Sequence, residues 1–177
     1  GVIWYRPTEL QQLLAFKKEH KEAAKIVVGN TEVGVEVKFK HFDYKYLVNP
    51  SQINALNQID VLRDGIKIGS AVTLSDIQIF LQKQINELPE SENRIYKSIV
   101  EMLHWFAGMQ VRNVASIGGN IMTASPISDL IPILMAANAK LEVESLDGGR
   151  RKIKIDENFF TGYRRNIIDS SEVLISV

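Results

Sequence analysis

The spacing of apolar residues predicts the elements at the start of the chain. Apolar residues recur at three- and four-residue intervals over residues 10–18, which is typical of an amphipathic helix, and Thr8 stands where its N-cap would be. The β-branched run 25–28 predicts a buried strand that ends in a tight turn. Valines at every second position over residues 33–37 predict a further strand, and so does the apolar stretch 46–48.

The rest of the chain alternates between helical and strand patterns. An Asp-Gly pair marks a hairpin turn at residues 63–65, and Thr73 precedes an apolar-periodic run that it would cap. The expected elements are a hairpin of residues 59–62 and 65–69 that continues into residues 71–72, helices over 74–81, 91–106 and 128–135, and strands over 140–145 and 151–155. This mixture predicts an α+β protein of two lobes, formed by residues 1–55 and residues 56–177.

Composition excludes several classes of function. The 177 residues carry 21 basic and 21 acidic side chains, and this zero net charge disfavours binding to nucleic acid or to an anionic membrane. No cysteine is present, which excludes disulfides, thiolate metal sites and iron–sulfur ligation within the chain. The three histidines have no metal-ligand spacing, and no Ser-His-Asp set indicates a hydrolase.

The ends of the chain and the length of its apolar stretches indicate in which cellular compartment the protein is expected. No apolar stretch approaches the roughly 20 residues of a membrane-spanning helix, and the N-terminus shows no signal-peptide pattern. The chain starts with Gly1 and ends on the strand-like run 174–177, which favours a piece of a longer polypeptide. We expect a cytoplasmic protein, with a peroxisomal one as the alternative.

Two segments rich in small polar residues are candidates for phosphate binding. Gly29-Asn30-Thr31 follows a predicted strand directly, where exposed backbone N–H groups could surround a phosphate. By itself this is equally typical of an ordinary turn. The second segment, residues 115–120, is predicted as a loop between two helices, and it includes Gly118-Gly119-Asn120. Neither segment matches the Rossmann fingerprint or the P-loop, so another type of nucleotide fold is required.

Three further side chains could contact a flat cofactor. Trp105 and Phe106 end a predicted helix shortly before the second glycine segment, and we expect Trp105 in the core and Phe106 against the ligand. Asp129 precedes an apolar helix, so it is either an acceptor for ligand hydroxyls or an N-terminal cap.

Across essentially its whole length the chain resembles the FAD domain of the molybdenum hydroxylases of the xanthine dehydrogenase type. Six blocks in order carry the resemblance: residues 25–34, 38–40, 105–108, 114–121, 123–130 and 159–164. The resemblance implies a two-lobed FAD-binding domain of the PCMH type, similar to the CO dehydrogenase flavoprotein. It also implies that the family's domain continues beyond residue 177 into a lobe that adds flavin and NAD contacts.

The residues that would line the FAD follow from this resemblance. They are Lys25, Ile26, Val27, Val28, Gly29, Asn30, Thr31, Glu32, Phe106, Ser116, Ile117, Gly118, Gly119, Asn120, Asp129 and Leu174. Tyr163 would border the nicotinamide of NAD, and packing at a strand end is its structural alternative. No catalytic side chain is implied, since the flavin carries the chemistry.

The resemblance also implies a function for the whole enzyme. The family oxidises hypoxanthine to xanthine and xanthine to urate, and it passes electrons through 2Fe-2S clusters to FAD and then to NAD. The molybdopterin and the clusters would lie in other domains of the polypeptide, which would form a homodimer. Two alternatives stay open: an aldehyde oxidase or related molybdenum flavoprotein, and a non-catalytic nucleotide-binding module.

Overall fold

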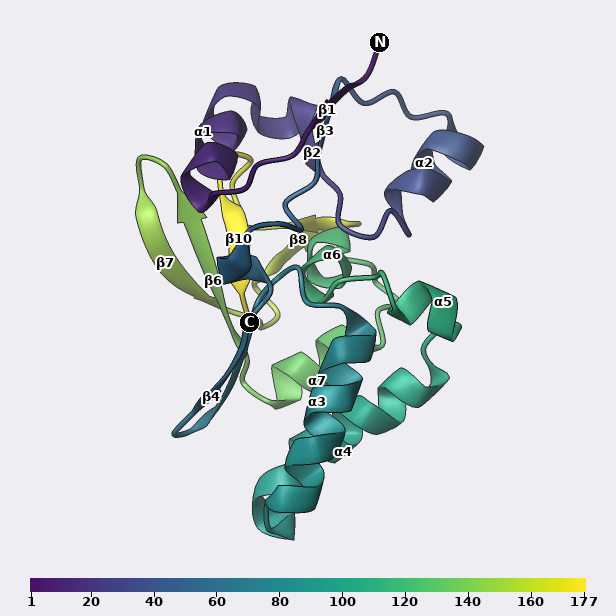
Figure 1. Cartoon of the computed structure of the whole chain (residues 1–177), viewed down its shortest axis with the longest axis vertical. Helices are drawn as coiled ribbons and strands as arrows, with labels where there is room; N and C mark the ends of the chain where they lie inside the picture. Colours follow the sequence, from purple (N-terminus) through teal and green to yellow (C-terminus); the bar gives the residue numbers. More distant parts are fainter.

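The computed structural model describes residues 1–177 as an assembly of helices and strands (Figure 1). Its buried apolar residues form three clusters: a main cluster of 19 residues, a second cluster of 9 and a third of 3. The strands are β1 Ile3–Tyr5, β2 Ala24–Ile26, β3 Tyr46–Val48, β4 Ile59–Leu62, β5 Gly65–Ile68, β6 Lys140–Ser145, β7 Gly149–Lys154, β8 Phe160–Gly162, β9 Arg165–Asn166 and β10 Val173–Ser176. The α-helices are α1 Leu10–His20, α2 Val33–Lys40, α3 Leu74–Glu87, α4 Glu90–Trp105, α5 Met109–Arg112, α6 Ile117–Thr123 and α7 Leu130–Ala136. Two 3₁₀ turns, η1 Lys21–Ala23 and η2 Asn54–Leu56, complete the chain, and no helix is long and apolar enough to cross a membrane.

The first sheet is parallel, with the order β1-β3-β2. Helix α1 packs on it through Leu13 and Leu14, and the carboxyl ends of all three strands point the same way. The expected helix is confirmed, but its N-cap is Glu9 and not Thr8. The side-chain oxygen of Gln12 accepts from the backbone N–H groups of both residues, which fixes the helix start one residue later.

The strand expected over residues 33–37 is wrong, because this segment forms helix α2. The alternating valines do not mark a buried strand face, since Val35 and Val37 are exposed. The buried positions are Val33 and Glu36, which lie three residues apart as one helical turn requires. His41 then ends the helix in the left-handed conformation, with φ of 56°.

Helices α3 and α4 run side by side away from the first sheet and form the lower end of the molecule (Figure 1). The predicted cap is confirmed, since the Thr73 hydroxyl accepts from the Asp76 backbone N–H at 3.1 Å. Leu81 and Leu103 are completely buried between the helices and the rest of the main cluster. The hairpin of β4 and β5 and the third helix are confirmed as well, although α7 starts only at Leu130.

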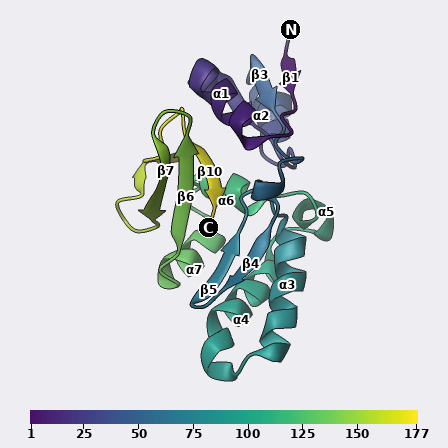
Figure 2. The ribbon, with the colours of Figure 1, turned by 60° about the vertical axis from the view of Figure 1, so that its left-hand side comes forward.

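Strand β10 joins the two largest hydrophobic clusters. It is an edge strand of the antiparallel sheet β10-β6-β7 (Figure 2). Because side chains alternate along a strand, Val173 and Ile175 belong to the cluster with α1 and the first sheet, while Leu174 belongs to the main cluster. The final residues of the chain therefore contribute to both cores.

Candidate functional site

A row of unpaired backbone donors follows strand β2. None of the backbone N–H groups of residues 28–32 donates to a backbone carbonyl, whereas the Val27 N–H still donates to the Val48 carbonyl at 2.8 Å. Asn30, in the middle of the row, has a left-handed backbone with φ of 57°. Consecutive free N–H groups on a turning backbone suit an anion, and the carboxyl edge of a parallel sheet is a common place for a ligand.

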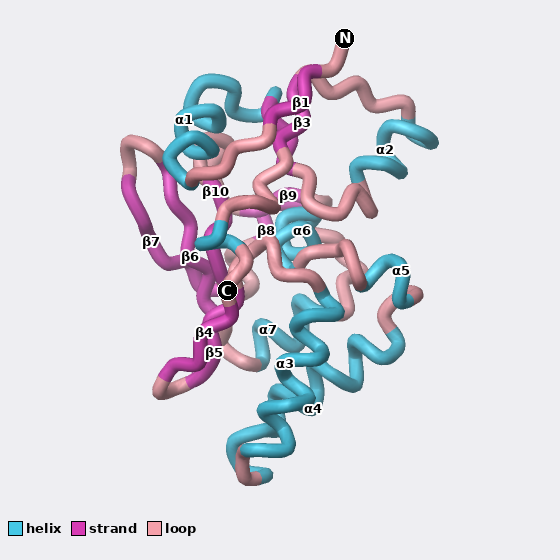
Figure 3. The backbone as a smooth tube through the Cα atoms, in the orientation of Figure 1, coloured by secondary structure: helices cyan, strands magenta, loops and turns pink.

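The structure brings the first glycine segment into contact with the second. A Cβ atom on Gly29 would lie 1.9 Å from the carbonyl oxygen of Val114 and 3.0 Å from the backbone nitrogen of Ala115. Only glycine therefore permits this approach between two backbones that are far apart in sequence. The contact places the donor row next to the start of α6, and Figure 3 shows the loops around α6 in pink.

The expected loop at residues 115–120 is in part a helix, because α6 starts at Ile117. Its first N–H groups are already bonded: Ile117 donates to the Val72 carbonyl at 3.1 Å, Gly118 to the Ser70 carbonyl at 2.9 Å, and Gly119 to the Ser116 hydroxyl at 3.0 Å. The sequence pattern failed here because a serine before two glycines also describes a capped helix start. This segment therefore offers an anion far fewer free backbone donors than residues 28–32 do.

Gly118 has a packing role in this arrangement. A Cβ atom at this position would lie 2.6 Å from the carbonyl oxygen of Ser70. Gly119 is less constrained, because the nearest atom to its added Cβ would be the Ser116 hydroxyl at 3.0 Å.

The side chain of Asn120 is oriented by a residue that sequence reasoning missed. The Ser128 hydroxyl donates to the Asn120 side-chain oxygen at 3.0 Å. The amide NH₂ of Asn120 then remains as a donor, which suits a phosphate or carbonyl oxygen. The neighbouring Asp129 occupies the N-cap position of α7 without a capping hydrogen bond, and its carboxylate is exposed.

The two aromatic residues at the end of α4 differ from expectation. Trp105 is 76% exposed, and its indole N–H donates to Glu101 at 3.1 Å, so the expected core position is wrong. Phe106 packs partly against the main cluster. The guanidinium of Arg112 donates to the backbone carbonyls of Phe106 and Ala107 at 2.7 and 2.8 Å, which fixes the turn that presents Phe106.

A cluster of charges lies at the end of the donor row. Glu32 forms an ion pair with Arg164, which lies in the turn between β8 and β9. The carboxylate of Glu32 also lies 3.8 Å from the ammonium of Lys40. Burial acts to lower the pKa of Arg164, but the hydrogen bond to Glu32 and the charges of Glu32 and Glu36 outweigh this effect, so the pKa is raised above its ordinary value. No local pattern identifies Arg164 as part of this site, because its partner is 132 residues away in the chain.

The buried carboxylate of Glu36 belongs to the same cluster, since it lies 4.0 Å from the guanidinium of Arg164. The Tyr44 hydroxyl donates to it at 2.6 Å, and the ammonium of Lys25 lies 3.6 Å from it. Burial, together with the hydrogen bond to Glu36, raises the pKa of Tyr44 well above its ordinary range, so the phenol stays protonated. The ammonium of Lys25 thus pairs with Glu36, while the backbone of Lys25 is part of β2.

Leu174 and Tyr163 complete the set of expected site residues. The Leu174 side chain is only 5% exposed and packs in the main cluster, which leaves its backbone as the part that could face a ligand. Tyr163 is 78% exposed at the tip of the β8–β9 turn, beside Arg164. It is therefore not packed at a strand end.

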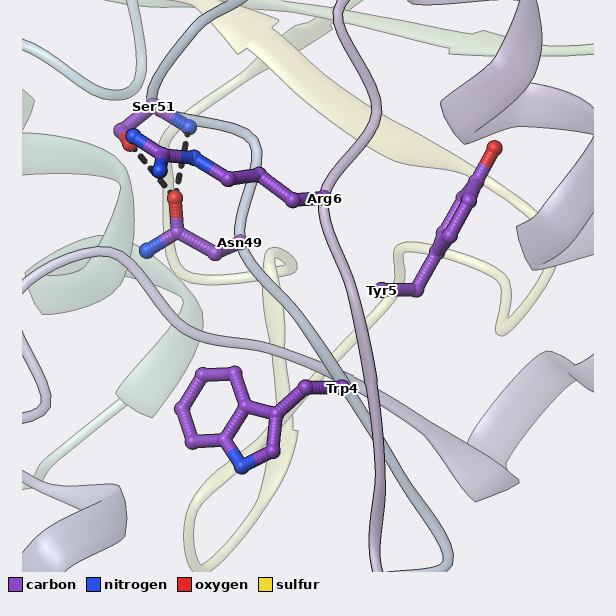
Figure 4. Close-up of a pocket in the computed structure, with 5 residues that line it drawn as sticks. All are labelled: Trp4, Tyr5, Arg6, Asn49 and Ser51. Atoms are coloured by element: carbon purple, nitrogen blue, oxygen red, sulfur yellow. Dashed lines mark hydrogen bonds between the residues drawn. The ribbon is translucent and has the colours of Figure 1, made fainter.

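A hollow of about 360 Å³ lies at the carboxyl edge of the parallel sheet, lined by Trp4, Tyr5, Arg6, Asn49 and Ser51 (Figure 4). It contains none of the expected FAD residues, but it adjoins them, because the amide of Asn49 donates to the Val28 carbonyl at 3.4 Å. This bond attaches the start of the donor row to the loop after β3.

Comparisons with known proteins identify the family of the chain. The model of the FAD binding domain in molybdopterin dehydrogenase matches residues 1–177. The chain is 54% identical to xanthine dehydrogenase of Drosophila pseudoobscura pseudoobscura and 48% identical to xanthine dehydrogenase/oxidase of Gallus gallus, in each case over 99% of this chain. It spans 13% of the length of these two relatives.

Solved structures show the fold. Carbon monoxide dehydrogenase from Hydrogenophaga pseudoflava matches with a TM-score of 0.85 at 22% identity, over 99% of this chain and 57% of that one. Quinoline 2-oxidoreductase from Pseudomonas putida 86 matches with a TM-score of 0.84 at 18% identity, over 99% of this chain and 57% of that one. These likenesses confirm the expected α+β fold of the CO dehydrogenase flavoprotein type. Since the family model covers every residue, the chain belongs to the family of FAD-binding domains of molybdopterin dehydrogenases.

Proposed function

We propose that this chain is the FAD-binding part of a xanthine dehydrogenase, and that residues 28–32 hold the FAD diphosphate with their free N–H groups. The observation that carries the site is the row of five backbone donors without backbone acceptors. Asn120 would add its amide, which Ser128 orients, and Phe106 would lie against the flavin. Residues 1–55 and 56–177 would form two lobes that share the cofactor, as the contact of Gly29 with Val114 suggests.

The donor set suits the chemistry of the cofactor. A diphosphate carries negative charge and many acceptor oxygens, and backbone N–H groups satisfy such oxygens without introducing a competing acceptor. FAD supplies the redox chemistry when it is bound, and the residues of this chain bind it, orient it and limit the access of water. None of them needs to act as a general base or a nucleophile.

The remaining part of the proposal concerns the complete enzyme. Under it, hypoxanthine and xanthine are oxidised at a molybdopterin centre elsewhere, and electrons reach FAD through 2Fe-2S clusters and leave to NAD. The support is the high identity to xanthine dehydrogenases over 99% of the chain. Tyr163 would border the nicotinamide, for which its exposed ring at the β8–β9 turn is suited. A homodimer is part of the same proposal.

The test of the site is Asn120→Asp in the full-length oxidoreductase that we propose carries this chain. A negative charge about 4 Å from the diphosphate costs about 1–4 kcal/mol at effective dielectric constants between water and the protein surface, so FAD affinity should fall at least about fivefold. Asn86→Asp is the matched control. This exposed residue lies twelve positions along α3 from Leu74, roughly 18 Å from the end of the helix that meets Ala115.

FAD affinity is measured by titrating the flavin-free protein and following flavin fluorescence. Equal affinities for the two variants would refute the role of Asn120. A wild-type protein that binds no flavin would refute the proposal itself and favour the non-catalytic module. Reoxidation of the reduced flavin by oxygen but not by NAD would favour the aldehyde oxidase alternative.

A further inference from the structure

The β8–β9 turn and the end of the donor row are linked by one ion pair. Arg164 reaches across from the turn to Glu32, which is the last residue of the row, and its guanidinium also lies 4.0 Å from a carboxylate oxygen of Glu36. The Arg164 side chain is 27% exposed, so the pair is partly shielded from solvent. A pair with this degree of burial is screened less than an exposed one.

Arg164 also has an unusual backbone. It is in the left-handed region with φ of 56°, which a residue other than glycine adopts at a cost of about 1–2 kcal/mol. Such a conformation persists only where the surroundings determine it. Here the two carboxylates, Glu32 and Glu36, provide the fixed partners.

Glu32 creates an electrostatic problem for the proposed ligand. Its carboxylate belongs to the segment that would hold a diphosphate, and two negative groups in one place repel each other. Arg164 and Lys40 are the two cations near this carboxylate, and Lys40 is the more distant and the more exposed of them. The guanidinium is therefore the main group that can neutralise Glu32 and fix its direction.

We propose that Arg164 is a positioning residue for the diphosphate-binding segment: it holds the Glu32 carboxylate and cancels its charge, so that residues 28–32 can accept an anion. The residue acts through Glu32 and needs no contact with the cofactor. This inference rests on the proposed function and extends it to a residue that lies 132 positions away from Glu32 in the chain.

The test uses Arg164→Gly in the full-length protein. Glycine removes the guanidinium but keeps the left-handed turn without strain, so the turn itself is retained. Affinity for FAD should fall about tenfold, the scale of one lost charge-assisted hydrogen bond. Affinity for ADP, which carries the same diphosphate without a flavin, should fall by the same factor. The matched control is Arg165→Gly, because Arg165 is exposed and forms no ion pair, and it should bind both ligands as the wild type does.

A second change separates charge from structure. Glu32→Gln removes the negative charge, so adding it to Arg164→Gly should restore FAD affinity to within about threefold of the wild type. Arg164→Lys, which keeps the charge but not the planar fork, should lie between the wild type and Arg164→Gly. A purely structural role would predict that the double variant binds no better than Arg164→Gly.

Each outcome decides the question. The inference is overturned if Arg164→Gly binds FAD and ADP as Arg165→Gly does, or if Glu32→Gln gives no recovery in the double variant. If Arg164→Gly does not fold, Arg164→Gln, which also removes the positive charge, takes its place, and wild-type affinity for FAD and ADP in that variant then overturns the inference. A wild-type protein that binds neither FAD nor ADP counts against the proposed function, which is a different result.

Discussion

Replacing Gly29 with alanine should damage both stability and cofactor binding. The new Cβ atom would lie 1.9 Å from the carbonyl oxygen of Val114, about 1.5 Å short of the 3.4 Å at which ordinary contacts begin. The obstacle is backbone on both sides, so no side chain can rotate out of the way. Overpacking of this kind costs about 1–3 kcal/mol, and a backbone clash belongs at the upper end.

The expected effect can be measured by thermal unfolding. At about 2–4 °C per kcal/mol for a chain of this size, a cost of about 3 kcal/mol lowers the Tm by about 6–12 °C. The N–H groups of residues 28–32 would also move relative to α6, so FAD affinity should fall more than tenfold. Gly65→Ala is the matched control, since a Cβ at Gly65 meets nothing within 4 Å and should change stability by less than about 0.5 kcal/mol. Equal melting temperatures for the two variants would refute the steric argument.

Three other predictions concern the core, a salt bridge and the orientation of a ligand donor. Phe159→Ala should cost about 3–5 kcal/mol in urea unfolding, because the ring is completely buried, and a loss below about 1 kcal/mol would contradict this. Glu142 has a pKa lowered by its hydrogen bond to Lys67, so its contribution of roughly 1 kcal/mol is present above about pH 4.5 and is lost as pH falls through the lower folded pKa. Glu142→Gln should therefore reduce the Tm at pH 7 and reduce it progressively less as the pH falls below about 4.5, and a pH-independent reduction would be inconsistent with this. Ser128→Ala should weaken FAD two- to tenfold, because it removes the hydrogen bond to Asn120, and it should lower the Tm by no more than about 4 °C, because the hydroxyl also accepts from the Ile131 N–H at 3.4 Å; unchanged FAD affinity would show that the bond to Asn120 has no role in binding.

The sequence predicted those helices and strands whose ends are fixed by interactions between residues close together in the chain. Thr73 caps α3 through a bond to a residue three positions later, so the sequence contains the whole interaction. The pattern misled over residues 33–37, because alternating valines describe a strand only if one face is buried. At α6, the identity of the acceptors for its first N–H groups depends on Ser70 and Val72, which no local pattern reveals.

In the candidate site too, the features contained in one stretch of sequence were predictable and the long-range contacts were not. The donor row of residues 28–32 is continuous in sequence and could be recognised from its glycine and polar residues. Its link to Arg164 depends on how the chain brings the β8–β9 turn next to Glu32 at the end of the donor row, which is a property of the whole fold. For Trp105 the prediction from residue type was wrong: a large aromatic residue at a helix end was expected in the core, but its side chain is exposed to solvent.

Strand β10 has a consequence for how the protein unfolds. Val173 and Ile175 fill one hydrophobic cluster, while Leu174, between them, fills the other. Neither cluster can lose this strand without exposing apolar surface of the other, so the two halves should melt in a single cooperative transition and not one after the other. A destabilising change far from the donor row, even among the α3 and α4 contacts, should therefore reduce the fraction of molecules that can hold a cofactor at all.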